Sequence, residues 1–260
     1  MKVESVPCKS ALSKSSLPGL QYTFNPYVGC EHGCLYCYVP DVIRRFSKPW
    51  GGDVGKKEGI LELLRSDLKR CPKGVVGVST ITDPYQPVEE ELKLTREALL
   101  ILKSSGFPVS VQTKSSIVRR DLSIMAGGNF ELGITITSMD SQFQKDFEPN
   151  ASPPEKRALA LEEAASMGIK TWVFYGPIIP GYNDSLEDIK SVVCLAKRTG
   201  SRLLFDKLNL KPLLAQRLHK VLSEDDLKVI KNYDYQKLFK IIINECKVNK
   251  VECSFAFDRQ

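Results

Sequence analysis

The chain has 260 residues, of which 42% are hydrophobic and 26% are charged, and its formal net charge is +6. This length suits one sizeable core. No apolar run approaches the ~20 residues that span a bilayer, and residues 1–16 lack the apolar centre of a signal peptide. We therefore expect a cytoplasmic protein without a membrane partner, whose basic excess suits a nucleic-acid partner but does not require one.

Runs rich in valine, isoleucine, threonine and aromatic residues alternate with helical patterns along the chain. In chain order, the predicted strands are Tyr22–Asn25, Val75–Ile81, Val109–Lys114, Glu131–Thr137, Thr171–Tyr175, Arg202–Asn209 and Val251–Phe257. The predicted helices are Glu58–Cys71, a segment with Leu92, Leu99 and Leu102, Pro154–Met167, a segment after Ser185, and Tyr235–Val248. Ser185 is a predicted N-cap, and Gly106, Gly168 and Gly200 are predicted helix ends.

This alternation predicts an α/β fold whose strands run parallel and are joined by right-handed crossovers. Such a sheet either closes into a full or partial barrel or stays open and doubly wound. In both arrangements ligands collect at the carboxyl ends of the strands. We therefore expect the residues that carry chemistry to lie just after each strand.

Eight cysteines occur in the chain, and three of them, Cys30, Cys34 and Cys37, form a C-x3-C-x2-C cluster after the first strand. The other five are dispersed, at Cys8, Cys71, Cys194, Cys246 and Cys253. Gly29 and Gly33 supply the tight turns that a metal-binding loop needs. In a cytoplasmic chain this clustering indicates metal or redox chemistry.

Three kinds of site compete for this cluster. A structural zinc site needs four ligands, but no second cysteine pair follows, and His32 is poorly placed to complete a tetrahedron. A ferredoxin-type cluster needs four thiolates. Chance clustering of core cysteines is disfavoured by the glycine-rich turn. Three thiolates around an iron–sulfur cluster leave one iron open to bind a ligand directly.

The C-x3-C-x-aromatic-C spacing, with Tyr36 at the aromatic position, resembles the radical S-adenosylmethionine (SAM) superfamily. Four segments resemble its spore photoproduct lyase-like branch: Asn25–Tyr38, Thr82–Glu89, Thr113–Ser115 with Arg120 and Asp121, and Pro177–Asp184. The resemblance covers most of the predicted barrel, and the last quarter of the chain adds little to it.

The resemblance implies a partial (β/α)6 barrel with a short N-terminal arm (residues 1–18), a barrel (19–215) and a C-terminal helix–strand extension (216–260). It also implies a [4Fe–4S] cluster on Cys30, Cys34 and Cys37 whose open iron chelates SAM. Reductive cleavage of SAM then gives a 5′-deoxyadenosyl radical, which abstracts a hydrogen atom from the substrate. An electron donor such as ferredoxin or flavodoxin is implied as a partner, and we expect a monomer.

Residues after the other strands are candidates for contacts with SAM. These candidates are Tyr36, Ser79, Thr80, Thr82, Asp83, Lys114, Thr135, Thr137 and Ile178. Oxygens at 79–83 suit the ammonium, Lys114 suits the carboxylate, Thr135 and Thr137 suit the ribose, and Ile178 suits the adenine. Each candidate also has a structural interpretation without SAM. Asp83-Pro84 is a sequence typical of turns, a lysine at a strand end is often an ordinary surface residue, and Thr135 and Thr137 could simply pack within a strand.

One departure limits what the resemblance implies. Spore photoproduct lyases carry a hydrogen-donating cysteine near the end of the second strand, whereas residues 76–82 here contain none. We therefore predict a radical SAM enzyme of lyase or oxidoreductase type on an unidentified substrate, with nucleic acid as the leading class. Cys253 is a weak candidate catalytic residue. The alternatives are a small-molecule- or peptide-modifying radical SAM enzyme and a non-catalytic zinc-binding module.

Overall fold

The computed structural model describes residues 3–43 and 50–256. Its main sheet has eight strands in the order β11-β10-β9-β8-β7-β6-β3-β2. Their bounds are β2 (Leu12–Lys14), β3 (Tyr22–Phe24), β6 (Val76–Val78), β7 (Val109–Thr113), β8 (Phe130–Thr135), β9 (Lys170–Ile178), β10 (Arg202–Lys207) and β11 (Cys253–Phe255). Only the β2–β3 pair is antiparallel among these described strands.

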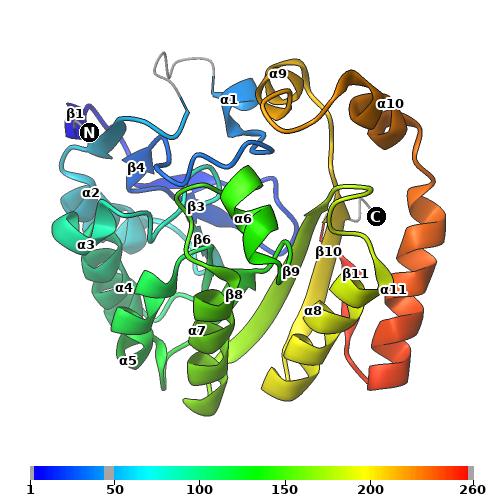
Figure 1. The fold of residues 1–260 in the computed structure, drawn as a ribbon. Coiled ribbons are helices and arrows are strands. Elements are labelled where there is room, and N and C mark those ends of the chain that lie inside the picture. The colour runs from blue at the N-terminus through cyan, green and yellow to red at the C-terminus, as the bar shows by residue number, and fades with distance from the viewer. Residues whose placement is uncertain (1–2, 44–49, 257–260) are drawn as a thin grey trace.

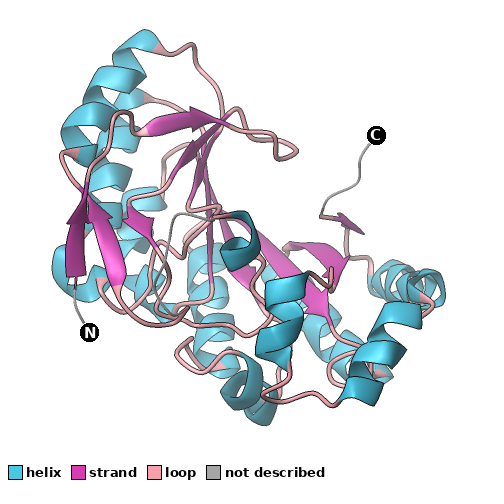
Figure 2. Ribbon diagram, turned by 90° about the horizontal axis from the view of Figure 1, so that it is seen from above, coloured by secondary structure: helices cyan, strands magenta, loops and turns pink. Residues whose placement is uncertain are grey.

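The strands follow an open arc, with helices along its outer side (Figures 1 and 2). Strands β3 and β6 to β10 are parallel neighbours in chain order, which confirms the predicted α/β fold and partial (β/α)6 barrel. In the described part of the chain the arc ends at β2 on one side and at β11 on the other.

All seven predicted strands are present, with shifted ends. The second ends at Val78 rather than Ile81, because Ser79 has a φ of 63° and so leaves the extended conformation. The fifth continues to Ile178, three residues beyond the prediction. Phe257, the predicted end of the last strand, lies outside the described residues.

A second, three-stranded sheet has the order β1-β5-β4 and was not predicted. It consists of β1 (Val3–Val6), β5 (Val54–Lys57) and β4 (Tyr27–Val28). The N-terminal segment therefore contributes β1 to this sheet and β2 to the main sheet.

Four predicted helices are α2 (Ile60–Arg70), α7 (Pro154–Ser166), α8 (Leu186–Thr199) and α11 (Tyr235–Asn249). The segment with Leu92, Leu99 and Leu102 is two helices rather than one: Leu92 ends α3 (Glu89–Leu92), Leu99 and Leu102 lie in α4 (Leu94–Ser105), and Lys93 between them has a φ of 54°. Ser185 caps α8 as predicted, since its hydroxyl accepts a hydrogen bond from the Asp188 backbone (3.1 Å), and Gly200 ends α8 with a φ of 63°. Shorter helical elements were not predicted: α1 (Val39–Val42), η1 (Ser116–Asp121), α5 (Leu122–Met125), α6 (Ser141–Phe147), α9 (Pro212–Leu218) and α10 (Glu224–Asn232).

The main core lies between the sheet and the outer helices and includes the fully buried Leu132, Val173 and Phe205. A second apolar cluster joins the cysteine loop to later elements: it contains Leu35 with Phe147 of α6 and Leu218 of α9. Segments far apart in sequence therefore meet above the sheet. None of the described helices is both long and apolar enough to cross a membrane.

The C-terminal segment packs against the barrel: α11 contacts α8, and β11 pairs with β10. Helix α9 spans the predicted boundary at residue 215, and the division of the chain into arm, barrel and extension stays a prediction.

Candidate active site

The cysteine loop begins directly after β4. Cys30 and Cys34 are buried and Cys37 is partly buried, and each carries a free thiol. Gly33 has a φ of 62°, and a Cβ added to it would lie 3.0 Å from the Cα of Gly51. Both the left-handed backbone and this close approach require glycine at position 33.

The segment after β6 holds one side of the loop. The backbone N–H of Glu31 donates to the Gln86 side chain (2.8 Å), and the carboxylate of Glu31 accepts a hydrogen bond from the Val88 backbone. The hydroxyl of Thr82 donates to the carbonyl oxygen of Gly29. Thr82, a predicted SAM contact, therefore supports the cysteine loop.

The end of α6 and the residues after it hold a second side. The Leu35 N–H donates to the Phe147 carbonyl (2.9 Å). Asn150 donates from its side chain to the Glu31 carbonyl (2.8 Å) and from its backbone to the His32 carbonyl (3.3 Å). These contacts fix the loop backbone on both sides of Cys34.

Arg217 of α9 holds the third side of the loop. Its Nε donates to the Leu35 carbonyl (3.3 Å), and its Nη2 donates to the Cys37 carbonyl. Sequence reasoning missed Arg217, since a basic residue about 180 positions downstream carries no local sign that it reaches the cysteines.

The three sulfurs are buried, and each has a cation or a backbone N–H group nearby. Burial raises the pKa of the Cys34 thiol to about 12, and the nearby Lys114 ammonium opposes that shift. Burial likewise raises the pKa values of Cys30 and Cys37, and the backbone N–H groups of His32 and Val39 oppose the two shifts. A bound metal replaces the proton on each thiol, and these donors stabilise the negative charge that results.

The residues present therefore fit a [4Fe–4S] cluster held by three thiolates. Within the described ranges, no three metal-ligating side chains converge as they would around a single ion. A cluster does not require such convergence, because each thiolate binds a different iron.

A buried network lies beneath the loop. The hydroxyl of Tyr36 hydrogen-bonds to Glu148 and to Thr137 (3.1 Å), and Glu148 is paired with Arg157. Glu148 and Arg157 are 1% and 0% exposed. Burial opposes ionisation of Glu148, but the positive charges of Arg157 and Lys114 lower its pKa to about 2.

Sequence reasoning missed Glu148 and Arg157. Charged residues usually lie on the surface, so nothing in their local sequence marks them as buried partners. The network gives the aromatic residue of the cysteine motif a structural role: it fixes the ring of Tyr36, which lies between Cys34 and Cys37 in the sequence.

Lys114 follows β7, as expected, and its charge faces the cysteine loop. Its Nζ lies 5.6 Å from the centre of the Tyr36 ring. Burial works against its charge, but Cys34 and Glu148 raise the pKa of Lys114 above its ordinary value. The structure thus brings Lys114 together with two predicted cofactor residues, Tyr36 and Cys34.

The Asp83 carboxylate already accepts hydrogen bonds from donors of the protein. The donors are the Tyr85 backbone (2.8 Å), the Thr113 hydroxyl (2.6 Å) and the Lys114 backbone (2.9 Å), and His32 lies 3.4 Å away. Burial opposes its ionisation, but His32 and these donors lower the pKa of Asp83 to about 2. These contacts favour Asp83 as an anchor for the ends of β6 and β7.

Unlike the Asp83 carboxylate, the Ser79 hydroxyl is free to bind a ligand. Its hydroxyl oxygen is buried and has no hydrogen-bond partner among the described residues. Its φ of 63° is costly for a residue with a side chain. Thr80, beside it, has a partly exposed side chain and is held through its backbone N–H by Asn25 (2.9 Å).

Thr135, Thr137 and Ile178 are buried, at 1%, 0% and 0% exposed. The Thr135 hydroxyl accepts from Gln112 (3.2 Å), and the Thr137 hydroxyl donates to Glu148 (2.8 Å). Such burial is also what strand packing alone would give, and the contacts of these three residues with SAM stay predictions.

Cys253 lies away from the cysteine loop. It is the first residue of β11, at the edge of the main sheet, and pairs in register with Leu203 near the start of β10. It therefore sits at the end of the strands opposite their carboxyl ends. The structure does not bring this candidate together with the three loop cysteines.

Comparisons with known proteins agree with this geometry. Residues 24–193 match the radical SAM superfamily. The uncharacterized protein MJ0683 of Methanocaldococcus jannaschii is 31% identical over 213 residues, covering 81% of this chain and 79% of that protein. The uncharacterized protein Rv2578c of Mycobacterium tuberculosis is 30% identical over 75% of this chain and 62% of its own length.

Among solved structures, a spore photoproduct lyase mutant has a TM-score of 0.75 at 16% identity, with 98% of this chain and 82% of that chain covered. Streptococcus suis SuiB bound to S-adenosylmethionine has a TM-score of 0.63 at 13% identity, covering 91% and 50%. These similarities show the fold, and the match of residues 24–193 confirms the family resemblance. The chain belongs to the radical SAM superfamily.

Proposed function

We propose that this protein binds a [4Fe–4S] cluster through Cys30, Cys34 and Cys37, cleaves SAM reductively and acts on a nucleic acid. The observation that carries the proposal is the loop itself: three free cysteines held from three sides at the carboxyl ends of the strands, with Lys114 facing them. Ligands of such sheets bind at this end.

When bound, the cluster supplies the electron that cleaves SAM into methionine and the 5′-deoxyadenosyl radical. A donor such as ferredoxin or flavodoxin provides that electron. The protein's own residues bind and orient SAM: Lys114 pairs with its carboxylate, and the hydroxyls of Ser79 and Thr80 accept from its ammonium. Tyr36, Glu148 and Arg157 keep the loop in place.

Nucleic acid is the proposed substrate for two reasons. The chain carries a net charge of +6, which favours a polyanionic partner. In addition, one structure with the same fold is a spore photoproduct lyase with bound AdoMet and dinucleoside spore photoproduct. Repair of that lesion is not proposed, since residues 76–82 contain no cysteine.

Transfer of deuterium tests the substrate. The reconstituted enzyme, SAM and dithionite are incubated with RNA or DNA deuterated on its sugars and bases, and 5′-deoxyadenosine is analysed by mass spectrometry. Deuterium in 5′-deoxyadenosine supports a nucleic-acid substrate. If deuterium enters only with labelled peptides or small metabolites, that part of the proposal is wrong.

A further inference from the structure

We propose that a cavity beside the cysteine loop, lined by α1, α9 and Trp50, binds one unpaired base of a single-stranded nucleic acid and its phosphate. This inference rests on the nucleic-acid substrate proposed above. The cavity is separate from Ser79, Thr80 and Lys114, the residues proposed to bind SAM.

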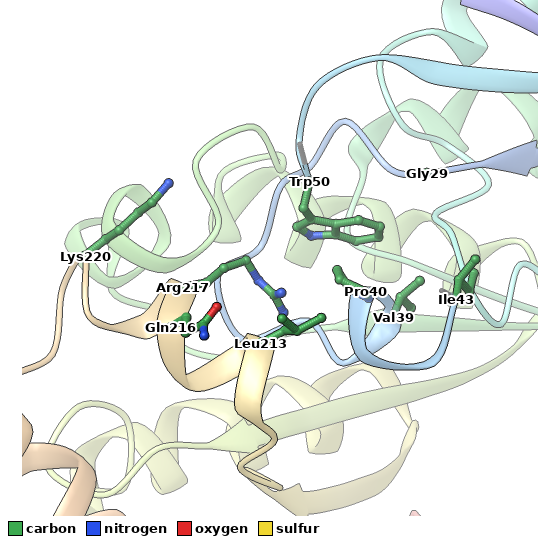
Figure 3. A pocket seen from close by; sticks show the side chains of 9 residues that line it. All are labelled: Gly29, Val39, Pro40, Ile43, Trp50, Leu213, Gln216, Arg217 and Lys220. Carbon is green, nitrogen blue, oxygen red and sulfur yellow. The ribbon is translucent and has the colours of Figure 1, made fainter. Parts of the chain in front are cut away.

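The cavity has the size and lining of an aromatic-ring site. Its volume is about 270 Å³, just below the ~300–1,000 Å³ typical of small-molecule sites, which suits a single ring. The apolar lining is Val39, Pro40, Ile43, Trp50 and Leu213. Figure 3 shows the Trp50 indole opposite side chains of α1 and α9, so a flat ring entering this space meets an aromatic face. Stacking on tryptophan suits any base, because every base has a π-face.

Trp50 also carries an unused donor. Its indole Nε1 is buried and has no hydrogen-bond partner within the described part of the chain. Such a donor is costly unless a ligand or water supplies an acceptor. The indole N–H lies in the ring plane, so a sugar or phosphate oxygen of the same nucleotide supplies the acceptor beside the base that stacks on the indole face.

The polar lining is positively charged. The described residues that line the cavity include the cations Arg217 and Lys220. Arg217 is already paired with Asp41 of α1, whose carboxylate lies 3.9 Å from its Nη2. Two of the five N–H donors of its guanidinium hold the cysteine loop, and Lys220 is exposed. Lys220 is therefore the cation that a phosphate linked to the base complements.

The cavity is joined to the cysteine loop at three points. Gly29, which lines it, precedes Cys30 in the chain, and Val39, which also lines it, follows Cys37 by two residues. Gly51, next to Trp50, packs against Gly33 of the loop. A strand anchored by one base here therefore has its neighbouring nucleotides beside the loop that is proposed to hold the cluster.

Fluorescence of Trp50 tests the site without turnover. The chain has two tryptophans, so Trp172→Phe leaves Trp50 as the sole one. Titration of the reconstituted Trp172→Phe protein with single-stranded oligonucleotides is expected to quench its emission saturably. Trp50→Leu is expected to weaken binding of a labelled oligonucleotide by about 5- to 150-fold, the value of one stacked base.

Lys220→Gln keeps the test valid if Trp50→Leu does not fold, because Lys220 is exposed. It is expected to reduce the slope of log affinity against log salt by about 0.7, the contribution of one phosphate on a single strand. Its matched control is Lys190→Gln, an exposed lysine on α8, which is expected to leave the slope unchanged.

Three results would overturn the inference: oligonucleotide binding without quenching of Trp50, no oligonucleotide binding, or a free nucleoside monophosphate that binds as tightly as the oligonucleotide. The first places nucleic acid elsewhere, and the last makes the cavity a small-molecule site. Formation of 5′-deoxyadenosine is measured separately. SAM cleavage without quenching rejects the cavity alone, and quenching without SAM cleavage rejects the proposed chemistry alone.

Discussion

The Nζ of Lys114 lies 5.6 Å from the centre of the Tyr36 ring. This contact joins the carboxyl end of β7 to the cysteine loop, two segments about 78 residues apart in the chain. A cation near an aromatic face is attracted by the ring. The ammonium therefore has a fixed position beside Cys34, where it can pair with an anion bound near the loop.

Replacing Lys114 by methionine is expected to weaken SAM binding by about tenfold to a hundredfold. The substitution keeps the length of the stem and removes a charge-assisted hydrogen bond worth about 1.5–3 kcal/mol. Equilibrium titration of SAM against the reconstituted protein measures the effect. Lys145→Met on α6 is the control, since Lys145 is exposed. If Lys114→Met and the unmodified protein bound SAM with equal affinity, Lys114 would not contact SAM.

Glu148→Gln is expected to lower the free energy of unfolding by about 3–5 kcal/mol, because it leaves the buried Arg157 charge without its partner. Urea denaturation measures this change. The matched control is Glu163→Gln, which breaks the exposed pair of Glu163 with Arg119 and is expected to cost no more than about 1 kcal/mol. Similar losses in the two variants would mean that the Glu148 network contributes no more than a surface pair.

The effect of Glu148→Gln on the free energy of unfolding is expected to depend on pH. The pKa of Glu148 in the folded protein, about 2, is below its unfolded value of about 4.3. Its stabilising contribution is therefore complete above about pH 4.3 and is lost as pH falls toward 2. The difference in stability between the unmodified protein and Glu148→Gln should narrow over that window. A difference that stays constant down to pH 2 would contradict the depressed pKa.

The positions of the strands and of the cysteine loop follow from short-range patterns. The C-x3-C-x2-C spacing and the β-branched runs are local, and the predicted turn at Asp83 is present, with its carboxylate accepting from the Tyr85 backbone (2.8 Å). The buried pair of Glu148 and Arg157 depends on distant segments packing over both charges, which no local pattern encodes. Strand β5 was missed for a related reason: Val54–Lys57 contains Gly55 and two lysines, and it is extended because it pairs with β1.

Ser79→Gly separates backbone strain from ligand binding. Glycine accepts a φ of 63° without penalty, so the variant is expected to unfold with a free energy about 0.5–1 kcal/mol higher. Loss of the hydroxyl is expected to weaken SAM binding by about two- to tenfold. Lys93→Gly, at another left-handed position (φ 54°), is the control. Lys93→Gly should gain stability and keep full SAM affinity. If SAM affinity were unchanged in Ser79→Gly as well, Ser79 would not be part of the SAM-binding site.

Iron analysis tests the cluster ligands. Replacing Cys30, Cys34 and Cys37 by alanine is expected to abolish iron binding after anaerobic reconstitution, whereas Cys194→Ala, at an exposed position, should retain about four irons per chain. Retention of iron by the triple variant would show that other residues hold it. Stoichiometric colourless zinc in the unmodified protein would favour the zinc-binding alternative.

The most direct test of the proposed chemistry is the formation of 5′-deoxyadenosine from SAM by the reconstituted protein with dithionite, followed by chromatography and mass spectrometry. The proposed function predicts that the unmodified protein forms it even without a substrate, and that the variant lacking Cys30, Cys34 and Cys37 does not. Bound SAM that is never cleaved by a protein with its cluster intact and reduced would contradict the proposed function.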